Sequence, residues 1–105
     1  MAIVVVGYNE KGIASDCLRS LESVDYVPRK VIYVDNDSPD GSLEHVQVSF
    51  PNVLAIPSGG NLGYCGGNNV GIAGALEIGA DFILILNPDT VVCNPGFIEI
   101  GRAHV

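Results

Sequence analysis

The sequence predicts an α/β fold with three layers, in which a mostly parallel sheet lies between helices, and two observations support this prediction. Strand-like apolar runs and helix-like amphipathic segments alternate along the 105 residues, which is typical of repeated βαβ units. The run Phe82–Leu86 contains no polar residue, as expected for a parallel strand that is covered on both faces. With 48% hydrophobic and 16% charged residues, we expect one packed domain over residues 1–105.

The first half of the chain predicts two strand–helix units. A strand over Ala2–Val6 is followed by a helix, which residues 25–29 end. The apolar stripe of this helix comprises Ile13, Cys17, Leu21 and Val24. A second strand over Val31–Val34 enters a turn at residues 35–41, which is rich in Asp, Asn, Ser, Pro and Gly. The short helix that follows is marked by Leu43, Val46 and Phe50.

The second half predicts a strand over Val53–Ile56, a glycine-rich loop over residues 58–69, a helix and a strand over Phe82–Leu86. We expect Asn68 and Asn69 to open the helix and Gly79 to follow its end. The apolar positions of this helix are Val70, Ala73, Leu76 and Ile78. Residues 95–105 predict one more helix, started by Asn94 and Pro95.

Composition excludes several classes of protein. The net charge of −7 would repel a nucleic-acid backbone, and the few basic residues form no basic patch in the sequence, so we expect no nucleic-acid partner. No apolar run is long enough to span a bilayer as a helix, and the first residues do not resemble a signal peptide, so a cytoplasmic location is expected. The three cysteines have no metal-binding or disulfide spacing.

Polar clusters follow three of the predicted strands, at residues 8–9, 35–37 and 87–89. Because the carboxyl ends of parallel strands meet at one edge of a sheet, we expect these clusters to converge on a ligand pocket. Asp89 could hold a divalent cation there, and an Asx turn is the alternative for this residue. A half-buried aromatic is the alternative for Tyr8, and ordinary helix capping is the alternative for residues 35–41.

The loop from Gly59 to Asn69 could bring backbone N–H groups close to an anionic or ribose-bearing ligand, and a flexible linker is the alternative. The chain contains neither the phosphate-binding Gly-x-x-x-x-Gly-Lys pattern nor any Gly-x-Gly. Neither His45 nor His104 has a serine or carboxylate placed to form a catalytic pair with it. The sequence therefore favours a binding edge and identifies no catalytic residue.

These motifs together resemble glycosyltransferase family 2, which has the GT-A nucleotide-sugar-binding fold, and especially its rhamnosyltransferase-like branch. Residues 6–9, Val-Gly-Tyr-Asn, resemble the family's Val-Asn-Tyr-Asn. Residues 34–42, Val-Asp-Asn-Asp-Ser-Pro-Asp-Gly-Ser, resemble Val-Asp-Asn-Gly-Ser-Thr-Asp-Gly-Ser. Residues 61–71, Asn-Leu-Gly-Tyr-Cys-Gly-Gly-Asn-Asn-Val-Gly, resemble Asn-Leu-Gly-Phe-Ala-Gly-Gly-Asn-Asn-Ile-Gly, and residues 86–90, Leu-Asn-Pro-Asp-Thr, match that branch directly.

The resemblance implies roles for individual residues. Tyr8 would lie against the nucleotide base, Asp35 would accept a hydrogen bond from it, and residues 61–69 would border the ribose and the sugar. The full set of implied nucleotide-binding residues is Tyr8, Asn9, Asp35, Asn36, Asn61, Gly63, Gly67, Asn68 and Asn87. Asp89 would face a divalent cation, Mg²⁺ or Mn²⁺. The family's usual Asp-x-Asp is here Asn87-Pro88-Asp89, so Asn87 contributes less charge to cation binding.

The implied function is that of the N-terminal, donor-binding half of an inverting glycosyltransferase. It would transfer a sugar from a UDP- or dTDP-linked donor to a hydroxyl of a saccharide or lipid-linked acceptor. Family domains are longer and carry the acceptor site and general base in their second half, so we expect this chain alone to be inactive and do not assign Glu99 as the base. A non-catalytic nucleotide-sugar-binding or interaction module is the alternative. We also expect self-association of the shortened domain, and a full-length protein peripheral to the inner face of the membrane.

Overall fold

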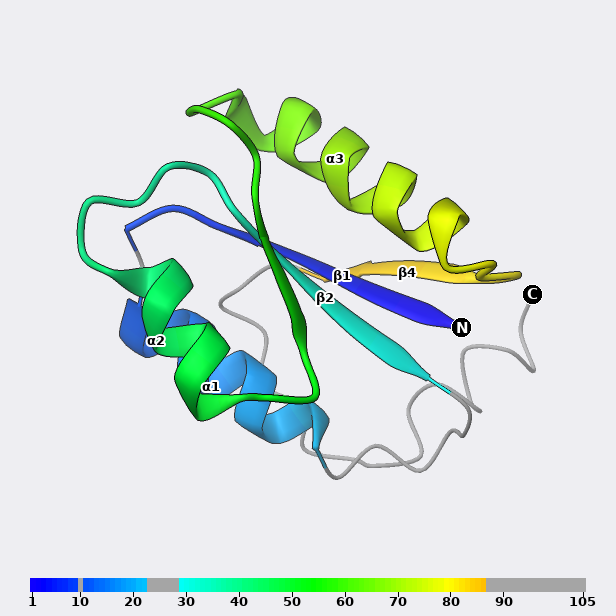
Figure 1. The fold of residues 1–105 in the computed structure, drawn as a ribbon, viewed down its shortest axis with the longest axis horizontal. Coiled ribbons are helices and arrows are strands. Elements are labelled where there is room, and N and C mark those ends of the chain that lie inside the picture. Colours follow the sequence, from blue (N-terminus) through cyan, green and yellow to red (C-terminus); the bar gives the residue numbers. More distant parts are fainter. Residues whose placement is uncertain (10, 23–28, 87–105) are drawn as a thin grey trace.

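The computed structural model describes residues 1–9, 11–22 and 29–86. Four strands form one parallel sheet in the order β3-β2-β1-β4. They are β1 (Ala2–Gly7), β2 (Lys30–Asp35), β3 (Leu54–Pro57) and β4 (Ile83–Leu86). Figure 1 shows α1 (Lys11–Leu21) and α2 (Ser42–Ser49) together on one face of the sheet and α3 (Gly63–Glu77) on the other. The three-layer α/β/α prediction is confirmed.

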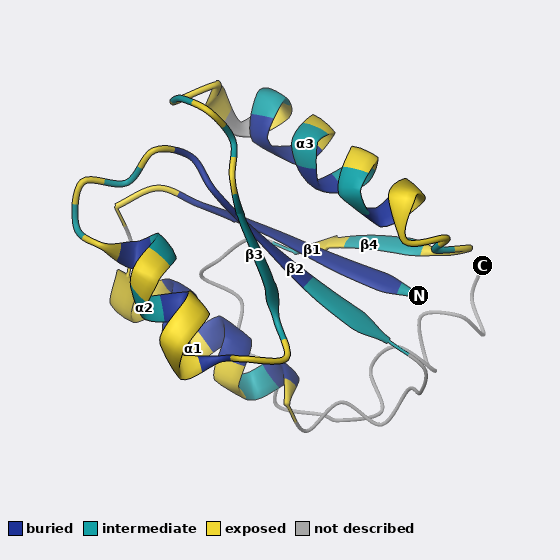
Figure 2. Cartoon of the chain, in the orientation of Figure 1, coloured by how far each residue is buried: buried dark blue, intermediate teal, exposed yellow. Residues whose placement is uncertain are grey.

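The sheet forms two separate cores because side chains alternate between its faces. On β1, Ile3 and Val5 pack with Tyr33 against α1 and α2, whereas Val4 packs with Val34 on the face that α3 covers. Every residue of β1 is buried, as Figure 2 shows by the dark blue strand at the centre of the sheet. An apolar, β-branched strand of this kind is stable only when both of its faces are covered.

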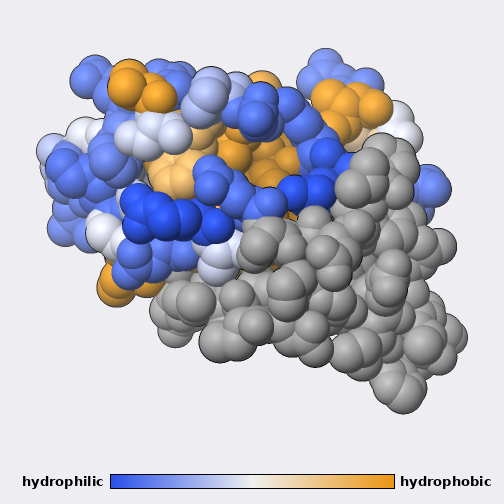
Figure 3. All heavy atoms as spheres, turned by 90° about the horizontal axis from the view of Figure 1, so that it is seen from below, coloured by the Kyte–Doolittle hydropathy of each residue, from blue (hydrophilic) through white to orange (hydrophobic). Residues whose placement is uncertain are grey.

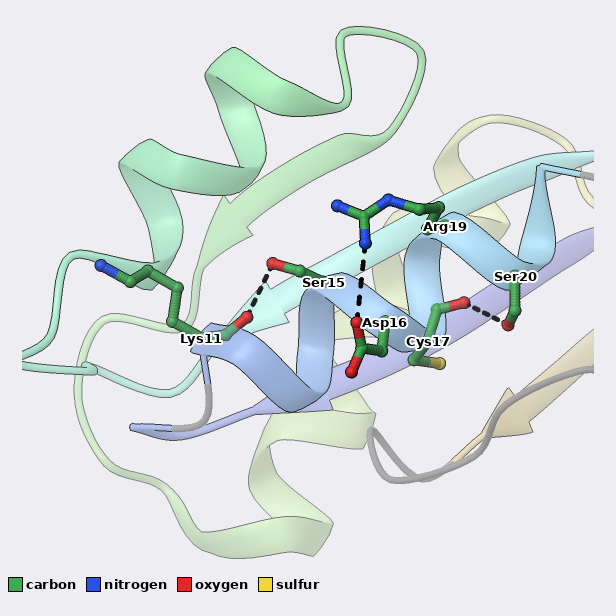
Figure 4. A network of polar contacts seen from close by, with 6 residues as sticks. All are labelled: Lys11, Ser15, Asp16, Cys17, Arg19 and Ser20. Atoms are coloured by element: carbon green, nitrogen blue, oxygen red, sulfur yellow. Dashed lines mark hydrogen bonds and ion pairs between the residues drawn. The ribbon is translucent and has the colours of Figure 1, made fainter.

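Helix α1 is amphipathic, although its buried stripe differs from the predicted one. Its buried residues are Ala14, Ser15, Cys17, Leu18 and Leu21. Ile13 is 48% exposed, so the prediction that it belongs to the buried stripe was wrong. Residues 14, 18 and 21 form the side of α1 that faces the sheet, and Ile13 lies on a different side of the helix. Ser15 is tolerated in the core because its hydroxyl donates to the carbonyl of Lys11, 2.7 Å away, as Figure 4 shows.

Helix α3 begins at Gly63, so the prediction of a loop reaching to Asn69 was wrong. The reason lies in close packing against the sheet. A Cβ on Gly67 would be 2.5 Å from a methyl carbon of Val6, and a Cβ on Gly71 would be 2.3 Å from one of Val4. The glycines therefore give α3 a smooth face that approaches the sheet closely, and this packing outweighs their poor intrinsic helix propensity.

Helix α3 ends as the sequence predicted, at a glycine. Gly79 has φ +79° and its N–H donates to the carbonyl of Leu76, while the N–H of Ala80 donates to the carbonyl of Ala75 at 3.0 Å. This pair of bonds is the Schellman arrangement, which satisfies the last carbonyls of the helix. The remaining strand boundaries agree with prediction to within one residue. The predicted helix over residues 95–105 lies outside the described residues.

The face that carries α1 and α2 has an open apolar hollow of about 520 Å³. Leu21, Val31, Phe50 and Val53 are among the residues that line it, at the amino ends of β2 and β3. Figure 3, viewed from this side, shows hydrophobic side chains surrounded by hydrophilic ones. Over the described ranges, no helix is both long and apolar enough to cross a membrane.

Candidate functional site

The loops that follow β1, β2 and β3 begin side by side at the carboxyl edge of the sheet. Gly7 is in register with Asp35, and Asp35 with Pro57. Two backbone hydrogen bonds extend this register past the strands: the N–H of Asn36 donates to the carbonyl of Gly7, and that of Ser58 to the carbonyl of Asp35, both at 2.9 Å. The predicted convergence is therefore confirmed for the clusters at residues 8–9 and 35–37, and the loop after β3 joins them. The third predicted cluster, residues 87–89, lies outside the described residues.

Hydrogen bonds hold the backbone on both sides of Tyr8. The carbonyl of Gly7 accepts the bond from Asn36, and the N–H of Asn9 donates to the Ser38 hydroxyl at 2.8 Å. Asn9 has φ +51°, a left-handed conformation that asparagine adopts more readily than most residues. The Tyr8 side chain is exposed at the edge. The backbone thus presents an aromatic ring to solvent at the position that the family resemblance places against a nucleotide base.

Asp35 has one bonded and one unbonded carboxylate oxygen. Its Oδ2 accepts the N–H of Ser38 at 3.0 Å, which shapes the turn after β2. Its Oδ1 is buried and has no hydrogen-bond partner in the described part of the chain. A buried acceptor without a donor is uncommon and costs free energy, so this oxygen is suited to accept a hydrogen bond from a ligand.

The start of α3 completes the edge. Gly63 has φ +73°, and its N–H donates to Oδ1 of Asn61 at 3.3 Å. The Asn36 amide joins this segment to β2, donating through Nδ2 to the carbonyl of Gly63 at 2.9 Å and accepting the N–H of Leu62 at 3.1 Å. The first turn of α3 therefore begins next to Asn36, the residue that follows Asp35, and its N–H groups and dipole favour an anion there.

Asn68 lies in the second turn of α3 and is only 8% exposed. Its Oδ1 is another buried oxygen that has no partner within the residues described. Gly67 and Gly74 lie on the side of α3 that faces β1, β2 and β3. Each residue of an α-helix is rotated by about 100° from the one before it, so Asn68 points to a different side of α3 than Gly67 does, toward β1 and β4. Gly67 itself faces the sheet, so its implied contact with a nucleotide stays a prediction, as does that of exposed Asn61.

Asp40 ties the loop after β2 to the start of α1 and to the start of α2. Oδ2 of Asp40 accepts the N–H of Lys11 at 3.1 Å, and its Oδ1 accepts the N–H of Ser42 at 3.0 Å together with the Ser42 hydroxyl. The Ser42 hydroxyl is the main cause that holds the pKa of Asp40 below its ordinary value. Asp40 was not among the predicted site residues, although its position in an Asp-Gly-Ser turn was a signal for capping.

Tyr33 supports the edge from within the core. Its side chain is buried on the α1–α2 side, and its hydroxyl lies against Gly7. Burial, and secondly the negative charge of Asp35, raise the pKa of Tyr33 well above its usual range. Sequence reasoning did not single out this residue, since a tyrosine within an apolar strand gives no sign of where its hydroxyl ends.

In the described ranges no group of three or more His, Cys, Asp or Glu side chains could hold a metal ion. Asp89 and Asn87, to which the sequence assigns the metal-facing place and a nucleotide contact, lie outside those ranges. The described edge therefore offers an aromatic ring, unpartnered buried oxygens of Asp35 and Asn68 and a helix start, which together suit a ligand with a flat base, hydroxyl groups and an anionic group. The buried Tyr33 hydroxyl is a third oxygen without a partner in the described residues.

Comparison with known proteins gives the following similarities. Residues 2–100 match the model of the family described as Glycosyl transferase family 2. The chain is 30% identical to the low-salt glycan biosynthesis hexosyltransferase Agl10 of Haloferax volcanii, over 99% of this chain and 32% of that protein. It is 32% identical to the N-acetylglucosaminyl-diphospho-decaprenol L-rhamnosyltransferase of Mycobacterium tuberculosis, over 94% of this chain and 34% of that protein. The chain thus spans about a third of the length of these curated relatives.

Solved structures show the same fold. TarS of S. aureus, in a crystal structure of residues 1–349 in complex with UDP-GlcNAc, superposes with a TM-score of 0.77 at 22% identity, covering 97% of this chain and 30% of TarS. The mannosyltransferase PcManGT of Pyrobaculum calidifontis, in complex with GDP-Man and Mn²⁺, superposes with a TM-score of 0.72 at 20% identity, covering 90% of this chain and 28% of that one.

Proposed function

Because the chain belongs to glycosyl transferase family 2, we propose that it is the donor-binding part of an enzyme that transfers a sugar from a nucleoside diphosphate to an acceptor hydroxyl. Its sheet and helices have the GT-A arrangement of the solved relatives. One observation carries the proposal: Tyr8, Asp35 and the start of α3 meet at the carboxyl edge of the sheet, and Asp35 presents a buried oxygen without a partner. Parallel α/β sheets bind ligands at this edge.

In the proposed complex the described residues bind and orient the donor. The Tyr8 ring stacks on the nucleotide base, and Oδ1 of Asp35 accepts a hydrogen bond from a base N–H, which replaces the missing partner. The N–H groups at the start of α3 face the anionic part of the ligand. Asn68 offers its buried oxygen to a hydroxyl of the ribose or the sugar. This arrangement fixes the donor before transfer.

The proposed transfer inverts the anomeric carbon. The acceptor oxygen forms a bond to that carbon while the bond to the diphosphate oxygen breaks, the diphosphate leaves with the electron pair, and a base outside the described residues takes the hydroxyl proton. A divalent cation held by Asp89 would supply positive charge to the leaving diphosphate. The GDP-Man and Mn²⁺ complex of PcManGT supports a cation in this fold.

The donor class and the acceptor are also proposals. UDP and UDP-GlcNAc in the TarS complexes support a uridine nucleotide, and a dTDP-linked donor, which has the same type of pyrimidine base, is the alternative. The name of the rhamnosyltransferase relative supports a lipid-linked saccharide as acceptor. Pyrimidine bases of both kinds carry an N–H that Asp35 can bind, so both nucleotides should be tested.

Calorimetric titration of the chain with UDP and dTDP, with and without Mn²⁺, tests the proposal. We expect binding that weakens about tenfold or more in Asp35→Asn, because the amide can present an N–H where the base requires an acceptor. Asp16→Asn is the matched control, since Asp16 is exposed on α1 and paired with Arg19 at 3.6 Å. Loss of the Mn²⁺ effect in Asp89→Ala would support the cation site. Indifference of the wild-type chain to both nucleotides would contradict the proposed function.

A further inference from the structure

We propose that Asn36 is a positioning residue: it holds the connection between β3 and α3 in the conformation that binds the nucleotide, and it does so without contacting the nucleotide. This inference rests on the proposed function and departs from the resemblance, which implies that Asn36 is a nucleotide contact. The geometry of the Asn36 side chain carries it, as three hydrogen bonds from that side chain all lead to one segment of the chain.

The Asn36 amide bonds to the two consecutive residues at which α3 begins. Nδ2 donates to the carbonyl of Gly63 at 2.9 Å, and Oδ1 accepts the N–H of Leu62 at 3.1 Å. The Ser58 hydroxyl lies 2.9 Å from the same Oδ1 and is also within reach of the Gly60 carbonyl. A single side chain at the end of β2 therefore connects the first residue after β3 with the first residue of α3.

These partners leave the Asn36 amide little capacity for a ligand. A backbone N–H can only donate and a carbonyl can only accept, so Leu62 and Gly63 fix which end of the amide is oxygen. Oδ1 accepts the N–H of Leu62 and faces the Ser58 hydroxyl, and one of the two Nδ2 hydrogens is used by the Gly63 carbonyl, so a single N–H of the amide is left without a bond in the described part of the chain. Asn36 is only 4% exposed, and a Cβ on Gly67 would lie 3.4 Å from Nδ2, so α3 also covers the amide from the side of the helix.

The position of Asn36 links two parts of the site. Its neighbour Asp35 carries the unpartnered oxygen, while Asn36 itself sets where the N–H groups of α3 begin. Because the two residues are consecutive at the end of β2, the spacing between the base-binding oxygen and the helix start is fixed by one short piece of backbone. Loss of the Asn36 bonds should leave the sheet intact and let that spacing vary, which weakens nucleotide binding.

The first experiment needs no ligand. Amide hydrogen exchange of the ligand-free chain reports the Leu62 N–H, with the β1 amide of Val4 as a measure of global stability. In Asn36→Ala we expect Leu62 to exchange about tenfold faster or more, with little change at Val4. Asn52→Ala is the matched control, since Asn52 is exposed near the amino end of β3 and far from the site. Unchanged exchange at Leu62 in Asn36→Ala would overturn the inference.

The second experiment separates positioning from direct contact through binding of UDP and dTDP. We expect Asn36→Ala to bind about tenfold more weakly, Ser58→Ala to be weakened in the same direction, and the double variant to lose less than the sum of both. A direct contact by Asn36 predicts additive effects or no effect of Ser58→Ala, and either result would overturn the inference. Wild-type binding that Asn36→Ala leaves unchanged would overturn it as well.

A conservative variant adds a readout that a general loss of stability would not change. In Asn36→Asp a carboxylate can accept from Leu62 and Ser58 but cannot donate to the Gly63 carbonyl, whereas the protonated acid can. Burial and the neighbouring negative charge of Asp35 should raise the pKa of the introduced acid toward this range. The ratio of variant to wild-type dissociation constants for uridine should therefore fall as the pH is lowered from about 7.5 to about 5, with Asn36→Ala showing no such recovery. A pH-independent ratio would overturn the inference. Failure of the wild type to bind any of these ligands would instead contradict the proposed function.

Discussion

The hydroxyl of Tyr33 lies against the backbone of Gly7, so close that a Cβ on residue 7 would be 2.5 Å from the Tyr33 oxygen. Gly7 is the last residue of β1 and directly precedes Tyr8, while Tyr33 is fully buried on β2. The contact thus joins the core of the α1–α2 face to the backbone that presents the exposed ring of the site. The absence of a side chain at position 7 is a requirement of packing.

Gly7→Ala is expected to destabilise the chain by about 1–3 kcal/mol, because the new methyl group also meets Cε2 of Tyr33 at 2.9 Å. Denaturant unfolding measures the change. Tyr33→Phe removes the nearest atom and should recover part of the loss in the double variant. Equal costs of Gly7→Ala in the wild-type and Tyr33→Phe backgrounds would contradict this explanation.

Tyr33 should make the stability of the fold fall at alkaline pH. Its pKa is raised in the folded chain, mainly by burial, so the folded state keeps a proton that the unfolded state loses near pH 10. This contribution is therefore complete below pH 10 and is lost above it, by about 1.4 kcal/mol per pH unit. Unfolding titrations should show a flatter alkaline slope in Tyr33→Phe. Tyr8→Phe, which changes an exposed ring, should keep the wild-type slope.

Asp40 should stabilise the junction of the loop after β2 with α1 at pH values above its ordinary pKa and lose this effect as the pH falls below it. The sign follows from its lowered pKa, which the Ser42 hydroxyl chiefly causes. In Asp40→Ala we expect faster amide exchange at Lys11, whose N–H donates to Asp40. Ser42→Ala should shift the acid unfolding midpoint to higher pH. Unaltered exchange at Lys11 would show that the contact does not hold the loop.

Helices α1 and α3 allow a matched glycine comparison. Gly71→Ala would place a methyl 2.3 Å from Val4 and 3.2 Å from Val34, so we expect a loss of about 1–3 kcal/mol in unfolding free energy. Gly12→Ala on α1 meets no atom within 4 Å, and we expect a gain of about 0.5–1 kcal/mol from better helix propensity. Similar effects at both positions would contradict the close approach of α3 to the sheet.

The predicted self-association can be tested at β4. In the described part of the chain β4 is an edge strand whose one neighbour is β1, and both Ile85 on this strand and Phe82 just before it are exposed. Exposed apolar residues on an edge strand favour pairing with another chain, so light scattering across a concentration series should show a dimer or larger species. Ile85→Lys should shift the distribution toward monomer. A monomer at every concentration in the wild-type chain would refute the prediction.

The sequence by itself determined the order of elements, the parallel α/β class and the edge at which polar residues converge. These features depend on local patterns: β-branched runs such as Ala2–Gly7, turn residues after each strand, and Gly79 at the end of α3. The motif resemblance also identified the family from residues alone. Each of these signals lies within a few neighbouring positions, and local sequence therefore carries it.

Only the tertiary structure decided what the glycines and the buried polar residues do. Glycine lowers helix propensity, so residues 63–69 were interpreted as a loop, and contact of Gly67 and Gly71 with β1 reversed that interpretation. The bond of Asn36 to Leu62 joins residues that are 26 positions apart along the chain, and the contact of Tyr33 with Gly7 is equally long-range. No local pattern encodes such contacts, because they exist only once the sheet has brought separate strand ends together.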